Sequence, residues 1–131
     1  MVVDTSALLA ILLGEPECDR YIALLVEAED PVISTGTLVE AWIVMQARAG
    51  DDGVSDLDDL LAVAAVRPIA VDADQARLAR ECFARFGKGR APAGLNFGDC
   101  FAYALARATN RPLLFKGADF ARTDVLSATS A

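Results

Sequence analysis

The chain has 131 residues, of which 54% are hydrophobic and 24% charged, and its net charge is −7. This length predicts a single domain over residues 1–131 with a core of its own, and the apolar content excludes a disordered chain. The acidic balance argues against a general nucleic-acid binder, and no stretch approaches the roughly 20 apolar residues of a membrane span.

The cysteines and the N-terminus bear on the compartment. Cys18, Cys82 and Cys100 are odd in number and far apart in sequence, which favours neither a disulfide framework nor a zinc site. No basic segment precedes the first apolar run, and Asp4 interrupts that run early, which argues against a secretory signal. We therefore expect a reduced, cytoplasmic protein with no membrane association.

Short apolar runs that are typical of buried strands alternate with amphipathic stretches that are typical of helices. In chain order, the first predicted elements are a strand at 2–3, helices at 6–13 and 17–28, a strand at 31–34 and a helix at 35–49 that Gly50 closes. Next comes a further helix, opened by a capping box at Ser55 and Asp58. It is followed by a strand at 68–71, a helix at 73–86, a loop at 87–96, a helix at 98–108 and a strand at 112–115, and 125–126 is a candidate fifth strand.

This alternation predicts an α/β fold. Right-handed βαβ units would give a parallel sheet of four to five strands with helices on both faces. Binding sites in such sheets form beyond the carboxyl ends of the strands.

Four acidic residues stand where a carboxylate is costly. Asp4 ends an apolar run, Glu40 lies in an apolar stretch, Asp99 opens a largely apolar helix and Asp119 follows the last predicted strand. A carboxylate beside a core must be desolvated, paired or bound to a metal, so we expect one shared acidic pocket. The chain has no histidine, and an acidic pocket without histidine indicates a hard cation such as Mg²⁺ or Mn²⁺.

Each of these residues also has a purely structural interpretation. Asp4 and Asp99 could cap the helices that they precede or open, and Asp119 could be a turn residue. Glu40 is harder to explain in this way, because it lies inside a helix. Trp42, Phe97, Phe101 and Tyr103 are predicted to pack in the core.

A basic strip interrupts the acidic sequence and is formed by Arg77, Arg80, Arg85, Lys88 and Arg90. Such a strip can hold a phosphate backbone, or it can be the solvated face of a helix and a loop, and the sequence does not decide between them. For RNA binding, the strongest candidates are Arg85, Lys88 and Arg90, because the loop around them is rich in glycine, with Lys116 as a further contact.

Four blocks of the sequence, at 3–8, 38–41, 95–104 and 114–120, resemble the PIN-domain family, and most closely its VapC toxin branch. The order and spacing of the blocks carry the resemblance, and the block Asn96-Phe97-Gly98-Asp99 is the most distinctive. The resemblance implies a three-layer α/β/α sandwich around a parallel sheet. It also implies an endoribonuclease toxin that depends on Mg²⁺, for which Mn²⁺ can substitute, and that has a cognate VapB-type antitoxin.

Site residues follow from the resemblance by position. Asp4, Glu40 and Asp99 match the carboxylates that hold the metal, and Asp119 matches the fourth. A supporting hydroxyl would come from Thr5 or Ser6. The family often has a hydroxyl and a further acidic residue before the fourth position, but Lys116, Gly117 and Ala118 stand there, which leaves one metal or two open. An arginine of the antitoxin would suit the pocket, and a homodimer is the usual closed oligomer.

Two other functions compete with the ribonuclease. A phosphate-accepting domain of the receiver or phosphatase type shares the fold class, but it would need acidic residues that this sequence lacks beside Asp4. A catalytically inactive PIN-fold interaction module is favoured only by the altered segment 116–118. RNA cleavage that depends on a metal would separate the first function from both others.

Overall fold

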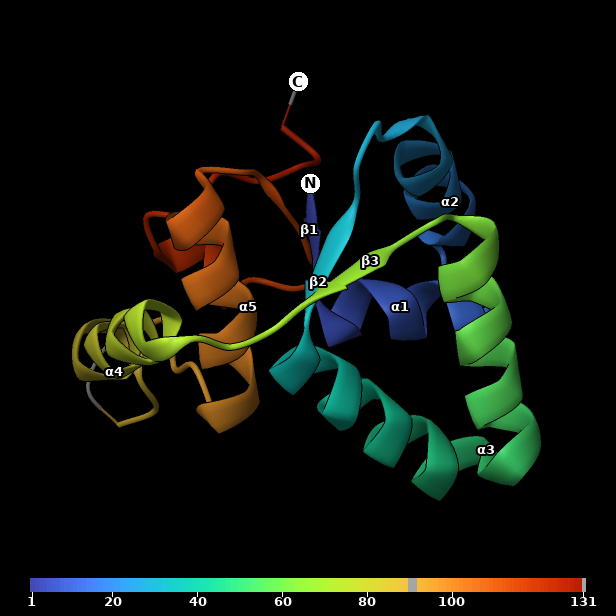
Figure 1. The fold of residues 1–131 in the computed structure, drawn as a ribbon, viewed down its shortest axis with the longest axis horizontal. Coiled ribbons are helices and arrows are strands. Elements are labelled where there is room, and N and C mark those ends of the chain that lie inside the picture. Colours follow the sequence, from blue (N-terminus) through green and yellow to red (C-terminus); the bar gives the residue numbers. More distant parts are fainter. Residues whose placement is uncertain (90–91, 131) are drawn as a thin grey trace.

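Four short parallel strands form the centre of the fold (Figure 1). The structure is a computed structural model that describes residues 1–89 and 92–130. Its strands are β1 (Val2–Val3), β2 (Val32–Ser34), β3 (Arg67–Ile69) and β4 (Leu113–Leu114), in the order β3-β2-β1-β4. Val2 pairs with Val32 on one side and with Leu113 on the other, so β1 is central. Parallel neighbours require crossover connections, and helices provide them.

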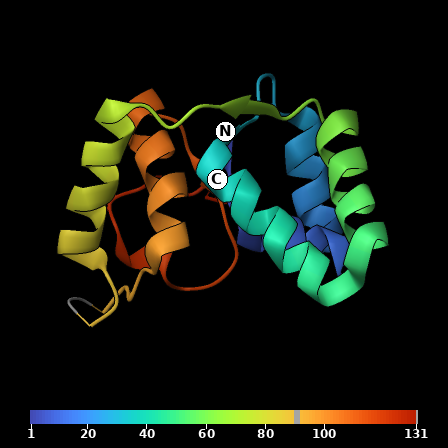
Figure 2. The same ribbon diagram turned by 60° about the horizontal axis from the view of Figure 1, so that its bottom comes forward.

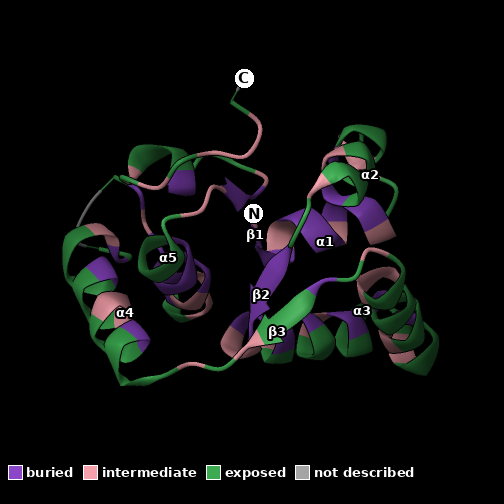
Figure 3. Cartoon of the chain, turned by 45° about the horizontal axis from the view of Figure 1, so that its top comes forward, coloured by how far each residue is buried: buried purple, intermediate pink, exposed green. Residues whose placement is uncertain are grey.

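Helices cover both faces of the sheet, as the alternation of elements predicts. They are α1 (Thr5–Leu12), α2 (Cys18–Glu27), α3 (Thr35–Val63), α4 (Ala73–Phe86) and α5 (Phe97–Thr109), with a short 3₁₀ helix η1 (Phe120–Arg122). Neighbouring strand residues point to opposite faces. Val3 accordingly packs in a core with α1, α2 and α3, whereas Val2 packs in a second core with α4 and α5. The strands β1 and β2 are buried, and β3 is the exposed edge (Figure 3).

α3 consists of two arms that meet at Gly50, where the predicted helix ends (Figure 1). Gly50 has φ 63° and ψ −156°, a backbone conformation that glycine adopts without strain. Trp42 Nε1 donates a hydrogen bond of 2.8 Å to Asp58 Oδ1 and ties the two arms together. The predicted capping box is wrong, because the second arm begins directly after Gly50 and Ser55 lies inside it.

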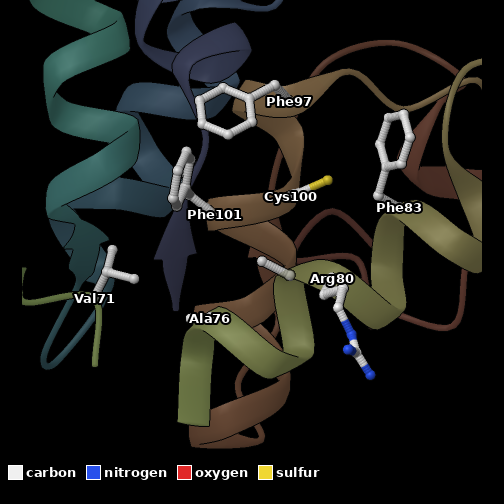
Figure 4. Close-up of a pocket in the computed structure, with 8 residues that line it drawn as sticks. Val71, Ala76, Arg80, Phe83, Phe97, Cys100 and Phe101 are labelled. Atoms are coloured by element: carbon white, nitrogen blue, oxygen red, sulfur yellow. The ribbon is translucent and has the colours of Figure 1, made fainter. Parts of the chain in front are cut away.

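Two further predictions need correction. Residues 125–126 do not form a fifth strand; the nearest pairing is an isolated bridge between Leu113 and Ser127. Tyr103 is buried as predicted, but Phe97 is 77% exposed and Trp42 is 38% exposed. Phe97 is the first residue of α5, and its ring lies edge-on against Phe101 with the centroids 5.0 Å apart (Figure 4). No helix in the described part of the chain is both long and apolar enough to cross a membrane.

Candidate active site

The four predicted carboxylates lie at the carboxyl-end edge of the sheet. Asp4 follows β1, and Asp119 follows β4 and precedes η1, while Glu40 comes from the first arm of α3 and Asp99 from the first turn of α5. Burial, with smaller contributions from the nearby charges of Asp99 and Glu40, raises the pKa of Asp4 to about 7. Burial also raises the pKa of Asp99, with smaller contributions from Glu40 and Asp119. These mutual effects show that the four carboxylates occupy one region.

Asp4 is only 2% exposed, and one of its two oxygens is fixed by its own chain. The Ser6 backbone N–H (3.0 Å) and the Ser6 hydroxyl (2.6 Å) both donate to Asp4 Oδ2, so Asp4 caps α1 as the structural interpretation expects. The Lys116 backbone N–H donates to the same Ser6 hydroxyl at 3.0 Å. Asp4 Oδ1 is buried, and no group in the described residues hydrogen-bonds to it.

Glu40 is positioned by two neighbours from other helices. The Thr5 hydroxyl donates to Glu40 Oε1 at 2.6 Å. A Cβ atom added to Gly98 would lie 1.7 Å from Glu40 Oε2, so the carboxylate packs directly against the first turn of α5. Both candidate hydroxyls therefore have a partner: Thr5 serves Glu40, and Ser6 serves Asp4.

Asp99 is part of a capping box at the start of α5. Its backbone N–H donates to Asn96 Oδ1, and its Oδ2 accepts from the Asn96 backbone N–H, both at 3.0 Å. The interpretation of Asp99 as a helix cap is therefore also correct. Asn96 and Gly98 contact the candidate carboxylates but were not among the predicted site residues, although both lie in the distinctive block 96–99 of the sequence. The available signal was a glycine in the first turn of a largely apolar helix.

Asp4, Glu40 and Asp99 share one pattern of hydrogen bonding. Each has one oxygen held by its own chain, and each keeps a second oxygen with no hydrogen bond from any described residue; these are Asp4 Oδ1, Glu40 Oε2 and Asp99 Oδ1. Among residues 1–89 and 92–130, no three acidic side chains lie close enough together to hold a metal ion. Carboxylates of like charge repel one another, which favours this wider spacing. Anionic oxygens are nevertheless the donors that a hard divalent cation prefers, and an unpartnered buried carboxylate oxygen fits that role.

Asp119 is held by fewer contacts than the other three candidate carboxylates. It is exposed, and its side chain makes no capping hydrogen bond to η1. Lys116, which stands in the altered segment before it, forms ion pairs with Glu15 and, at 3.1 Å, with Glu17.

The residues proposed for RNA binding differ in whether an acidic side chain already pairs with them. Arg85 pairs with Asp124 at 3.2 Å and lies over the ring of Phe86, 4.6 Å from its centroid. Lys88 is exposed and forms no ion pair with any residue that the structure describes. Arg90 lies outside the described residues.

The raised pKa of Asp4 predicts how stability depends on pH. In metal-free buffer the unfolded chain releases this proton above the ordinary pKa of 3.8, whereas the folded chain keeps it until about pH 7. The free energy of unfolding should therefore fall as the pH rises through this window, by at most about 1.4 kcal/mol per pH unit for one group. Denaturant unfolding with EDTA, at several pH values, measures this slope. Asp4→Asn should flatten it, and identical slopes in both proteins would contradict the assignment.

Comparison with known proteins places this geometry in a family. A sequence model of the PIN domain matches residues 1–126. The chain is 51% identical over 127 residues to a Ribonuclease VapC of Mycolicibacterium smegmatis, covering 95% of this chain and 97% of the relative. It is 48% identical over 125 residues to Ribonuclease VapC30 of Mycobacterium tuberculosis, covering 95% of each chain.

Solved structures share the fold at lower identity. One is VapC20 of Mycobacterium tuberculosis, described as a toxin that cleaves the sarcin-ricin loop, with a TM-score of 0.77 at 21% identity over 95% of each chain. Another is VapBC2 from Rickettsia felis bound to a DNA fragment from their promoter, with a TM-score of 0.75 at 18% identity over 96% of this chain and 94% of that one. These matches confirm the predicted parallel α/β architecture.

Proposed function

The chain belongs to the PIN-domain family and, within it, to the VapC ribonucleases, and we propose that its acidic pocket is the centre that cleaves RNA with the help of Mg²⁺ or Mn²⁺. The observation that carries this proposal is the free oxygen on each of three neighbouring carboxylates, one of them fully buried. Asp4, Glu40 and Asp99 would hold the ion, with Asp119 as a fourth acidic group. Family membership favours this function over the phosphate-accepting domain.

The chain's own residues prepare this centre before any substrate arrives. When bound, the ion would supply an acidified water and positive charge beside the phosphate. Ser6 and Thr5 fix the orientation of Asp4 and Glu40 through short hydrogen bonds, and Asn96 fixes Asp99. Such hydrogen bonds lower the reorganisation that the carboxylates need during the reaction.

A cleavage assay tests the proposal. Protein treated with EDTA and then dialysed should cut RNA only after Mg²⁺ or Mn²⁺ is restored, and Glu40→Gln should remain inactive with either ion. Sequencing the new RNA ends would identify the target. Cleavage by the metal-free protein, or by Glu40→Gln at the parental rate, would contradict the proposed centre.

We propose further that the chain is the toxin of a toxin–antitoxin pair and acts in the cytoplasm. Solved structures with the same fold include a toxin–antitoxin complex from Klebsiella pneumoniae and VapBC2 of Rickettsia felis. A cognate VapB-type antitoxin would inhibit by placing an arginine among the carboxylates, since a guanidinium matches carboxylate geometry. The three cysteines are free thiols, which suits a reducing compartment.

The RNA backbone is expected to contact Lys88 and Arg90 rather than Arg85 or Lys116, both of which are paired with acidic residues. Lys88→Ala combined with Arg90→Ala should weaken the binding of many RNAs alike and flatten the salt dependence of affinity by roughly one unit of slope per lost contact. Titration of the Asp99→Asn variant at several salt concentrations measures this. Arg48→Ala is a matched control on an exposed position of α3. An unchanged slope would mean that the strip is only a solvated face.

A further inference from the structure

The candidate carboxylates come from two groups of helices that pack in separate cores. Figure 2 shows α4 and α5 on one side of the molecule, and α2 with the second arm of α3 on the other. The first group forms one core, and the second forms the other core together with α1. Asp4 precedes α1 and Glu40 lies in α3, whereas Asp99 lies in α5. The geometry of the site therefore depends on segments that contact both groups.

The segment that directly follows β4 is such a connection. The ring of Phe115 packs in the core of α4 and α5. The backbone carbonyl of the same residue accepts a buried hydrogen bond of 3.0 Å from the Tyr21 hydroxyl on α2. The next residue, Lys116, pairs through its ammonium with Glu15 and, at 3.1 Å, with Glu17, both of which lie between α1 and α2. Two consecutive residues are thus anchored to the corner between α1 and α2.

The three charges of this corner form a partly buried network. The side chains of Lys116, Glu15 and Glu17 are 33%, 31% and 35% exposed. The hydrogen bonds to Glu15 and Glu17 raise the pKa of Lys116, and the hydrogen bond from Lys116 lowers the pKa of Glu17, so all partners attract one another at neutral pH. An isolated surface ion pair contributes little to stability, but a network of several charges holds its members in place more firmly.

The backbone of Lys116 reaches the acidic pocket through Ser6. The Lys116 N–H donates to Ser6 Oγ at 3.0 Å, and the Ser6 hydroxyl donates to Asp4 Oδ2 at 2.6 Å. A hydroxyl has a single proton to donate. Because Ser6 Oγ accepts from Lys116, its proton is directed to Asp4. This arrangement fixes Asp4 Oδ2 and leaves Asp4 Oδ1 without a hydrogen bond from the described residues.

We propose that Lys116 is a positioning residue for the reaction. Its ion pairs with Glu15 and Glu17 hold the backbone after β4 at the place from which the Lys116 N–H orients Ser6, and Ser6 in turn orients Asp4. This inference rests on the proposed function of the acidic pocket. It gives the altered segment 116–118 a part in an active site, because Lys116 acts there through its own chain and not as a contact to RNA.

Hydrogen exchange in metal-free protein tests this chain of contacts without RNA or an ion. We expect the backbone amide of residue 116, followed by NMR, to exchange roughly fivefold or more faster in Lys116→Met than in the parent, after correction for intrinsic rates, because its hydrogen bond to Ser6 is weakened. Lys116→Arg keeps the charge and should exchange at nearly the parental rate. A parental rate in Lys116→Met would overturn the proposal.

Cleavage kinetics test the consequence for the reaction. Lys116→Met should lower kcat about 10- to 100-fold with an unchanged KM for RNA, as is typical when a residue that orients a ligating group is lost. Lys116→Arg should restore most of this loss. In a Ser6→Ala protein, Lys116→Met should cause no further loss, because the path to Asp4 is already interrupted. Arg67→Met is the matched control, since it breaks a 2.9 Å ion pair with Asp30 at the opposite edge of the sheet.

The outcomes separate this inference from its competitors, and thermal melts establish that each variant folds. A raised KM with an unchanged kcat in Lys116→Met would make Lys116 an RNA contact and overturn the proposal. Losses that multiply in the double variant would do the same, because Lys116 would then act by a route other than Ser6. Parental cleavage by Lys116→Met beside an inactive Glu40→Gln protein would contradict this inference alone. Parental cleavage by Glu40→Gln would contradict the proposed centre, and the exchange rates would still decide whether Lys116 orients Ser6.

Discussion

Asp99→Asn is expected to lower RNA cleavage by about a thousandfold or more while the chain stays folded. The amide oxygen of asparagine can still accept the hydrogen bond from the Asn96 backbone that Asp99 Oδ2 accepts now. The other position becomes an NH₂ group, which donates instead of accepting. The substitution therefore keeps the helix cap and removes only the free anionic oxygen, so it separates the two roles of this residue.

Cleavage of a defined RNA under single-turnover conditions measures the effect, and thermal melting checks the fold. Asp59→Asn serves as the control, because Asp59 is exposed on the second arm of α3. It should cut RNA like the parent. An Asp99→Asn protein with parental cleavage would remove Asp99 from the active centre. A large fall in melting temperature would mean that capping is its main role.

Gly98→Ala should strongly reduce RNA cleavage without lowering the thermal stability of the protein. The new methyl group would lie 1.7 Å from Glu40 Oε2, and Glu40 can yield because its carboxylate is the end of a flexible side chain. Alanine is also the better helix former, by up to about 1 kcal/mol. We therefore expect an unchanged or higher melting temperature, together with a Glu40 carboxylate that can no longer occupy its place beside Asp99.

A double-mutant cycle with Glu40→Ala isolates this effect. When the Glu40 carboxylate is absent, Gly98→Ala meets no obstacle, so the two substitutions together should cleave no worse than Glu40→Ala alone. The proposed centre also predicts that Mn²⁺ stabilises the parent against thermal unfolding, and this stabilisation should disappear in Gly98→Ala. Parental cleavage by the single Gly98→Ala variant would show that the position of Glu40 against α5 has no importance for the reaction.

Sequence patterns predicted the layers of this fold well because strands buried on both faces and helices buried on one face have different apolar periods. They also selected Asp4, Glu40 and Asp99 as candidate site residues, since a charge beside apolar residues can be read from the sequence. In the structure Asp4 and Asp99 both cap helices, and each keeps an oxygen with no hydrogen bond from the described residues, so capping does not compete with the proposed role at the site.

Other features could not be predicted because they depend on which elements meet in space. Gly98 faces Glu40 only because α3 crosses α5 at that point, and no local pattern encodes the crossing. Phe97 has an apolar side chain of the kind found in protein cores, yet it is exposed. The periodicity of a sequence shows which side of a helix is apolar, but it does not show whether another element covers that side. The second arm of α3 was misplaced because Gly50 reverses the chain without a linker.

The free-energy cost of burying Asp4 bears on how readily the protein could lose its activity by mutation. A neutral residue at this position, such as asparagine, removes a desolvated charge and keeps an acceptor for Ser6. The Asp4→Asn protein, which the proposed centre predicts to be inactive, should therefore fold at least as well as the parent. A single-base change converts an aspartate codon to an asparagine codon. The fold therefore offers little resistance to loss of activity, and any selection that keeps the gene active must act on the RNA cleavage itself.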